Sequence, residues 1–238
     1  MTVRRFLGAL AAVVVLVTAG ATPAPASAVP RADLEVTAGQ VGSTALSAAA
    51  LPTFRWASYR VTAATLRYSY RAGCPVTPDK LRMVHVYFVG FDGRQHLGQL
   101  VVALPQVLAV VGVFKKMYNA RFRIQRMHAI DYYHGSDAGS MAANNTSAFN
   151  CRAVTGGTTW SQHSYGNAID INPVQNPYIS GSSVQPAAGR DYLNRSVVRT
   201  GMIRSGDVVD RSFTAAGWRW GGRWTSPKDY QHFSANGR

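Results

Sequence analysis

Residues 161–170 (SQHSYGNAID) place a histidine and an aspartate, His163 and Asp170, seven positions apart among turn-forming residues. Gly166 lies between them, and because glycine permits a tight turn, the two side chains can converge on one point. Ala168 is small and leaves room beside a metal ion. Imidazole and carboxylate groups that converge in this way are typical zinc ligands, although His and Asp at this spacing also occur often as structural residues.

A second segment, residues 229–233 (DYQHF), holds Asp229 three positions before His232. That spacing brings both side chains to one side of a turn, but not to one face of a flat strand. Two histidines and one carboxylate form a common zinc set with a fourth position open to water, and His163, Asp170 and His232 match it. A hydrolytic site of this kind also needs a carboxylate that takes a proton from water, and Asp229 is available for that role.

Together, the two segments resemble the paired motifs of the M15 zinc peptidases, which are D-alanyl-D-alanine carboxypeptidases and L-alanyl-D-glutamate endopeptidases. Residues 161–170 match the pattern Ser-x-His-x-x-Gly-x-Ala-x-Asp, and residues 171–178 (INPVQNPY) look like the same subgroup. Residues 229–233 match the second motif, in which an acidic residue stands three positions before a zinc histidine. The resemblance extends over about residues 75–235.

The resemblance implies a function as well as a ligand set. His163, Asp170 and His232 are expected to bind one Zn²⁺, and Asp229 to act as the general base. The family uses an arginine upstream of its first motif to steady the substrate carbonyl or carboxylate, and Arg152 stands where a matching residue is expected. The implied activity is hydrolysis of peptide bonds in bacterial peptidoglycan stem peptides, of the D,D-carboxypeptidase or L,D-endopeptidase type.

A β-hairpin is expected upstream of these motifs. Residues 81–91 and 95–103 are rich in valine, leucine and aromatic residues, and Asp92-Gly93 between them is a two-residue turn signal. A loop of that length would place His96 opposite Val89 and His85 opposite Leu100, so the two histidines would be about 13 Å apart and could not share a metal ion. The histidines on these two strands are therefore expected to be structural residues.

The remaining elements are shorter. From Pro105 the apolar residues recur at helical spacing, which predicts a helix. Further expectations are strands at residues 122–127, 168–172 and 230–233, a helical turn at residues 212–217, and a long loop at residues 135–157. Short strands mixed with a few helices indicate an α+β fold, a small antiparallel sheet with flanking helices. The resemblance implies, more specifically, the Hedgehog/DD-peptidase-like zinc peptidase fold.

The chain carries a formal net charge of +14, which favours anionic partners. Anionic cell-wall polymers are therefore expected partners beside the stem peptides. Nucleic acid, the usual partner of a basic chain, is not expected, because the chain has no nucleic-acid-binding motif and is predicted to be exported. The same charge would also suit a non-catalytic cell-wall-binding module on the same fold, but the complete ligand set with Asp229 favours an enzyme.

The N-terminal region predicts export. Residues 1–28 have the layout of a secretory signal peptide, with two arginines, an apolar run and small residues before the expected cleavage site. The apolar run is shorter than the about 20 residues of a membrane span, so no stable membrane anchor is expected. Residues 29–53 are interpreted as a flexible leader, and residues 54–238 as an M15-like zinc peptidase domain. The protein is expected to be extracellular and associated with the cell wall.

The chain has two cysteines, Cys74 and Cys151. In an oxidising compartment two cysteines usually pair, so a disulfide between them is expected. Such a bond would connect the segment before the hairpin to the segment just before the histidine motif.

Overall fold

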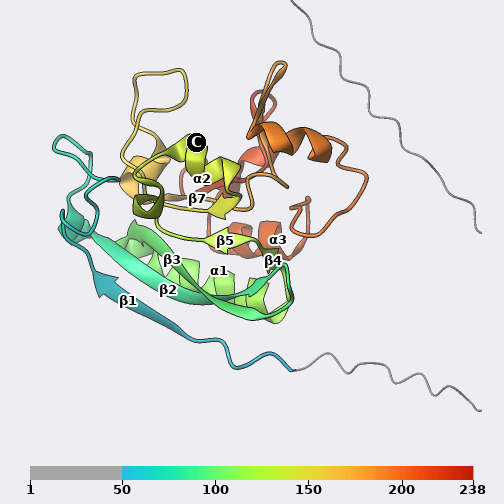
Figure 1. Cartoon of the computed structure of the whole chain (residues 1–238), viewed down its shortest axis with the longest axis horizontal. Helices are drawn as coiled ribbons and strands as arrows, with labels where there is room; N and C mark the ends of the chain where they lie inside the picture. The colour runs from blue at the N-terminus through green and yellow to red at the C-terminus, as the bar shows by residue number, and fades with distance from the viewer. Residues whose placement is uncertain (1–49, 238) are drawn as a thin grey trace, which may run out of the picture. The chain divides into compact units, whose positions relative to one another are not determined.

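The structure is a computed structural model that describes residues 50–237 (Figure 1). The predicted signal peptide and most of the predicted leader lie outside these residues. Short helices alternate with small, mostly antiparallel sheets in the described part, as expected for an α+β fold. Among residues 50–237, no helix is long and apolar enough to cross a membrane.

The largest sheet is built on the expected hairpin. Strand β2 (Leu81–Gly90) pairs antiparallel with β3 (Gln95–Ala103) on one side and with β1 (Trp56–Arg60) on the other. A short strand, β4 (Arg123–Ile124), pairs in parallel with the end of β2. Valine, leucine and aromatic residues dominate β2 and β3, and their alternate burial fits a sheet with one face on the core.

The connection between β2 and β3 is longer than the predicted two-residue turn at Asp92-Gly93. The Gly90 amide donates to the Arg94 carbonyl oxygen over 2.8 Å, so four residues join the strands. The predicted register was therefore wrong by one residue, and His96 lies opposite Phe88. The turn signal located the hairpin correctly but not its loop length.

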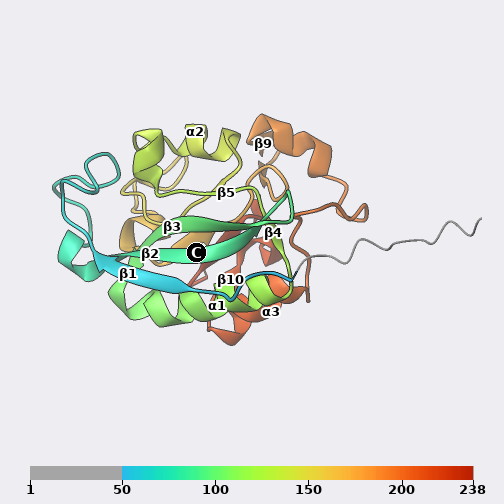
Figure 2. The same ribbon diagram turned by 60° about the horizontal axis from the view of Figure 1, so that its bottom comes forward.

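Helix α1 (Val107–Asn119) follows the hairpin, as its apolar spacing predicts. It packs on the sheet and beside α3 (Val208–Ala215), as Figure 2 shows. The residues that α1 buries are Val107, Val110, Val111, Val113, Phe114, Met117 and Tyr118. Full burial of such a side chain contributes about 1.5–3 kcal/mol to folding, so the packing of α1 against the sheet stabilises this part of the fold.

Two smaller sheets carry the C-terminal half. One has the order β10 (Arg219–Trp220), β12 (His232–Ser234), β7 (Ala168–Asp170). The other has the order β11 (Lys228–Asp229), β8 (Tyr178–Ser180), β9 (Ser183–Gln185). The strand expected at residues 168–172 is present but shorter, and the one expected at 230–233 begins two residues later and ends at Ser234. The expected turn at residues 212–217 overlaps the end of the longer α3.

Residues 135–157 are not the continuous loop that their composition predicts. They contain helix α2 (Asp137–Ala142). Ser136 caps its N-terminus, and the Ser136 hydroxyl accepts a hydrogen bond from the Gly139 amide over 3.1 Å. They also contain β6 (Asn145–Thr146), which pairs with β5 (Arg126–Met127). The strand expected at residues 122–127 is accordingly divided between β4 and β5. Short 3-10 helices lie at Pro78–Lys80, Leu104–Gln106, Ile130–Tyr133, Gln162–Tyr165, Ala187–Tyr192 and Gly221–Arg223.

The expected disulfide is present. Cys74 and Cys151 are bonded, with their Cα atoms 6.0 Å apart. Arg71, three residues before Cys74, donates from its Nη1 to the Cys151 carbonyl oxygen over 2.9 Å. The bond therefore fixes the chain at the residue immediately before Arg152.

Candidate metal centre

Two of the predicted metal ligands face each other across a pair of antiparallel strands. His232 on β12 lies directly opposite Asp170 on β7. Residues in this relation point to the same side of the sheet with their Cβ atoms about 4.5–5.5 Å apart. His232 Nδ1 lies 3.0 Å from Asp170 Oδ1, and both residues are buried.

The third ligand reaches the same point through a tight turn. His163 lies in the 3-10 helix Gln162–Tyr165, which ends at Gly166 with a left-handed backbone (φ 67°). A Cβ atom on Gly166 would lie 2.5 Å from the backbone nitrogen of Ala103, so only glycine fits there. The chain then enters β7, and His163 Nε2 lies 3.2 Å from Asp170 Oδ2. The predicted role of Gly166 in bringing the two side chains together is confirmed.

The three side chains fit a metal ion. His163 Nδ1 donates to the Ala148 carbonyl oxygen over 2.6 Å, which leaves the Nε2 lone pair directed at the site. That Nε2 is 3.3 Å from His232 Nδ1, and one ligand atom from each of His163, Asp170 and His232 lies within 4.8 Å of the others. Buried acceptor atoms gathered so closely favour a shared cation, and two imidazoles with one carboxylate are a zinc-type donor set.

The two aspartates near the histidines have opposite electrostatic character. Burial raises the pKa of Asp170, but the charges and hydrogen bonds of His163 and His232 lower this pKa by more, so it lies well below its usual range. Burial raises the pKa of Asp229 to about 7, because the charge of His232 offsets the burial only in part. Asp170 is therefore a permanent carboxylate suited to a metal, whereas Asp229 can exchange a proton near neutral pH.

Asp229 reaches the site from a different sheet. It ends β11, opposite Tyr178 on β8, and a bend separates it from His232. A Cβ on Gly221 would lie 2.7 Å from the Asp229 carbonyl oxygen, so glycine permits this close approach. Asp229 Oδ1 is buried and finds no hydrogen-bond partner among residues 50–237. Within this part of the chain, the oxygen is therefore a buried acceptor that still lacks a donor.

All of these side chains line one cleft with a volume of about 1000 Å³. Two of the four tryptophans around the motifs, Trp160 and Trp224, are half-buried and line it. Trp218 and Trp220 are buried in the core instead. The metal ligands thus lie in a cleft large enough for a peptide, with aromatic rings on its walls.

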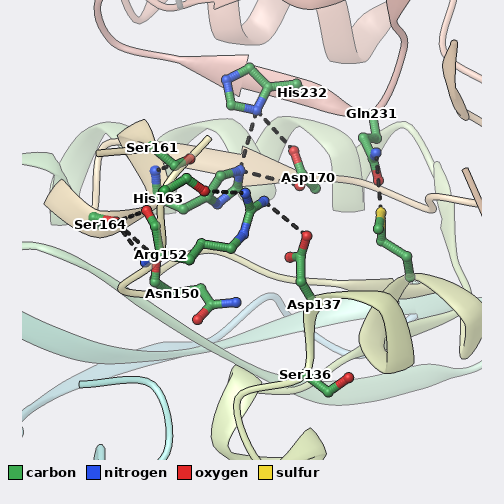
Figure 3. A network of polar contacts seen from close by, with 12 residues as sticks. Ser136, Asp137, Asn150, Arg152, Ser161, His163, Ser164, Asp170, Gln231 and His232 are labelled. Carbon is green, nitrogen blue, oxygen red and sulfur yellow. Dashed lines mark hydrogen bonds and ion pairs between the residues drawn. The ribbon is translucent and has the colours of Figure 1, made fainter. Parts of the chain in front are cut away.

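Arg152 also lines this cleft, and several contacts fix it there (Figure 3). Its Nη2 lies 3.0 Å from Asp137 Oδ2 at the start of α2, and its backbone amide donates to Ser164 Oγ over 2.9 Å. The Arg152 Nε is buried without a hydrogen-bond partner among the described residues. The structure therefore places the predicted arginine in the same cleft as His163, with its Nε still unpaired.

A family model described as D-alanyl-D-alanine carboxypeptidase, which belongs to the M15 peptidases, matches residues 155–235. This match confirms the resemblance to the M15 peptidases over residues 155–235, a shorter stretch than the expected 75–235. The M15 match includes His163, Asp170, Asp229 and His232, and begins three residues after Arg152. No curated protein and no solved structure gives a significant match.

Asp137 is the site residue that sequence reasoning missed. It lies in the segment interpreted as a loop, and it anchors Arg152. A local signal was present, because Ser136 followed by an acidic residue is a typical helix start. The M15 motifs themselves do not extend to this part of the chain.

Proposed function

We propose that this protein is a secreted zinc-dependent peptidase that hydrolyses peptide bonds in the stem peptides of bacterial peptidoglycan, as a D,D-carboxypeptidase or an L,D-endopeptidase. The observation that carries the proposal is the buried set of His163, Asp170 and His232 in a cleft that also holds Asp229. The M15 match supports the peptidase class, and the donor set supports zinc.

His163 Nε2, His232 Nδ1 and the Asp170 carboxylate would hold the metal. Zinc bound there would polarise the scissile carbonyl and make a water molecule more acidic. The hydrogen bond from His163 Nδ1 to Ala148 keeps the Nε2 lone pair pointed at the site. The low pKa of Asp170 keeps its carboxylate charged at any pH at which the enzyme would work.

Asp229 is the proposed general base. Its buried, unpartnered Oδ1 accepts a proton from the attacking water and returns that proton to the leaving amine. Burial raises the pKa of Asp229 in the metal-free site, and a bound cation would lower it again, so the carboxylate would be charged and able to accept a proton near neutral pH. Arg152 is proposed to donate a hydrogen bond to a carbonyl or carboxylate oxygen of the substrate.

Export and wall association are part of the proposal. The disulfide between Cys74 and Cys151 supports an oxidising compartment. The net charge of +14 supports attraction to anionic cell-wall polymers, and no role in nucleic-acid binding is proposed.

The deciding experiment is digestion of purified peptidoglycan by the zinc-loaded protein, followed by mass analysis of the released fragments. Release of single D-alanine residues would identify a carboxypeptidase, and release of longer stem peptides an endopeptidase. The Asp229→Asn variant is the matched control and should release little of either product. The charge of the chain also favours a non-catalytic wall-binding module. If that alternative is right, the protein should cosediment with peptidoglycan and release no fragment.

A further inference from the structure

One face of helix α2 contacts two side chains of the cleft. Asp137 and Met141 are four positions apart, so they lie on the same side of this helix. Asp137 holds the Arg152 guanidinium at 3.0 Å, and the Met141 sulfur accepts from Gln231 Nε2 at 3.6 Å. Figure 3 shows Arg152 and Gln231 on either side of Asp170. The helix therefore sets the spacing of these two polar groups beside the metal ligands.

Gln231 is the less expected member of this pair. It precedes His232 directly, lines the cleft, and is only 2% exposed. Its Oε1 is buried and has no hydrogen-bond donor among residues 50–237. Burying an unpaired amide oxygen costs free energy, so a native protein keeps one mainly where something else supplies the donor.

Met141 orients the Gln231 amide together with Asp229, whose carboxylate also accepts a hydrogen bond from the Gln231 side chain. A thioether sulfur accepts hydrogen bonds and cannot donate, so its contact with Nε2 leaves Oε1 for another partner. That partner must be a donor that enters the cleft.

The chemical class of the donor follows from the rest of the cleft. Asp229 Oδ1 is a second buried acceptor without a donor, whereas Arg152 Nε is a buried donor without an acceptor. A peptide backbone presents N–H donors and C=O acceptors in alternation. It could therefore supply donors to the buried oxygens and an acceptor to Arg152 Nε. An ammonium group would favour the Asp229 carboxylate over a neutral amide, whereas a backbone N–H is a neutral donor that every peptide substrate carries.

We propose that Gln231 is a substrate-binding residue whose Oε1 accepts a hydrogen bond from one non-scissile backbone N–H of the peptide substrate. Met141 is the positioning residue that orients the Gln231 amide. This inference rests on the proposed peptidase function and identifies a recognition group of the same site. Neither M15 motif specifies the residue type at position 231.

The test uses a series of synthetic stem peptides in which each non-scissile amide in turn is replaced by an ester, which removes one N–H without adding bulk. The zinc-loaded wild type and the Gln231→Met variant are compared on every peptide by kcat/KM, and by calorimetric affinity. In the wild type, one ester should lower kcat/KM about tenfold, mainly through KM, as expected for loss of one hydrogen bond to a buried acceptor. In Gln231→Met the all-amide peptide should already show that loss, and the same ester should add nothing.

Gln185→Met is the matched control, because it makes the same substitution at a half-buried glutamine of the same cleft. It should keep the ester sensitivity of the wild type. Met141→Leu should keep that sensitivity in part while raising KM, since the Gln231 oxygen remains but its orientation is less fixed. Equal zinc content and melting temperature in all variants would show that the folds are intact.

The outcomes separate the two proposals. If wild type and Gln231→Met cleave the peptides and respond identically to every ester, the role of Gln231 is overturned and the peptidase function stands. A protein that neither cleaves nor binds any peptide of the series overturns both proposals.

Discussion

Asp170 and His232 lie directly opposite each other on β7 and β12, with Asp170 Oδ1 3.0 Å from His232 Nδ1. Residues 62 positions apart in sequence thus meet through the register of one antiparallel strand pair. His163 completes the set from a turn at the start of β7. The candidate metal centre is therefore built on backbone pairing, which holds side chains more precisely than mobile loops do.

The protein is expected to bind one zinc ion per chain. His163→Ala and His232→Ala should each abolish stoichiometric binding, because either change leaves only two ligands. Zinc at 100 times its dissociation constant should stabilise the fold by about 2.7 kcal/mol, and a chelator should reverse this shift. Metal analysis and thermal unfolding with and without zinc provide the measurements, and absence of zinc from the purified and the reconstituted wild type would refute the assignment.

The Asp229→Asn and Asp170→Asn variants should distinguish the proposed general base from a proposed metal ligand. In Asp229→Asn the amide keeps the shape of the side chain but cannot accept a proton, so turnover should fall by about 10²–10⁴-fold while zinc remains bound. Asp170→Asn should weaken zinc affinity as well as rate, because it removes a charged ligand. Kinetics and zinc titration on both variants test these roles, which would be exchanged if Asp229→Asn lost the metal and Asp170→Asn kept it.

The metal-free protein should show opposite pH effects from the two aspartates. The pKa of Asp229 is raised to about 7 in the fold, so between about pH 4 and 7 the folded state binds more protons than the unfolded state. Its contribution to stability is therefore fully present at low pH and is lost as the pH rises to about 7. Asp229→Asn should flatten this decline, measured by urea unfolding of the metal-free protein across that range.

The pKa of Asp170 is lowered in the fold, and the sign is reversed. Below about pH 4 the unfolded state binds the extra proton, so the stability that Asp170 contributes is present above that pH and is lost on acidification. Asp170→Asn should weaken the acid dependence of unfolding instead of the dependence near neutral pH. Equal pH profiles for the two variants would contradict the electrostatic difference described above.

The denatured, unreduced protein should contain no titratable thiol, because Cys74 and Cys151 are bonded. On the chain-entropy model, removing the bond by Cys74→Ser with Cys151→Ser should destabilise the fold by about 4 kcal/mol. KM should rise as well, since Cys151 precedes Arg152 in the cleft. A thiol assay and urea unfolding measure the first two effects, and two thiols in the unreduced sample would exclude the bond in the mature protein.

Asp137→Asn should weaken substrate binding without changing metal content. The substitution removes the charge that holds the Arg152 guanidinium at 3.0 Å, so this side chain becomes less ordered. KM should rise several-fold, with a smaller effect on kcat, because Arg152 is proposed to bind and not to transfer protons. Steady-state kinetics with zinc analysis provide the check, and a loss confined to kcat would argue for a different role.

The hairpin, α1 and the metal ligands were predictable because their signals are local or belong to known motifs. Valine-rich strands and the apolar spacing of α1 are visible within a short window of sequence. The length of the loop at Asp92-Gly93 was not, because the same dipeptide occurs in turns of more than one length. The M15 match supports the class of the site but not the zinc itself or the detailed fold family.

Helix α2 and the burial of Gln231 could not be predicted in the same way. Gly139 and Ser140 are weak helix formers. The helical conformation of α2 must therefore be stabilised by packing against neighbouring segments and not by intrinsic helix propensity. Gln231 stands between two motif residues in a position where the motif allows any residue. Its buried amide follows only from the way β11, β12 and α2 enclose the cleft, which no single segment encodes.

If the proposed site binds zinc, the pairing of β7 with β12 also makes zinc content a test of sample quality. Side chains alternate between the two faces of a strand, so a slip of one residue would place Phe233 opposite Asp170 and turn His232 to the other side. Such a chain would also turn Phe233 out of the core, where its ring stacks on Phe213 and Trp220, so the slipped form would be less stable than the native one. The slipped form could not bind the metal, so the fraction of zinc-loaded molecules in a preparation would count those whose strands have paired in the native register.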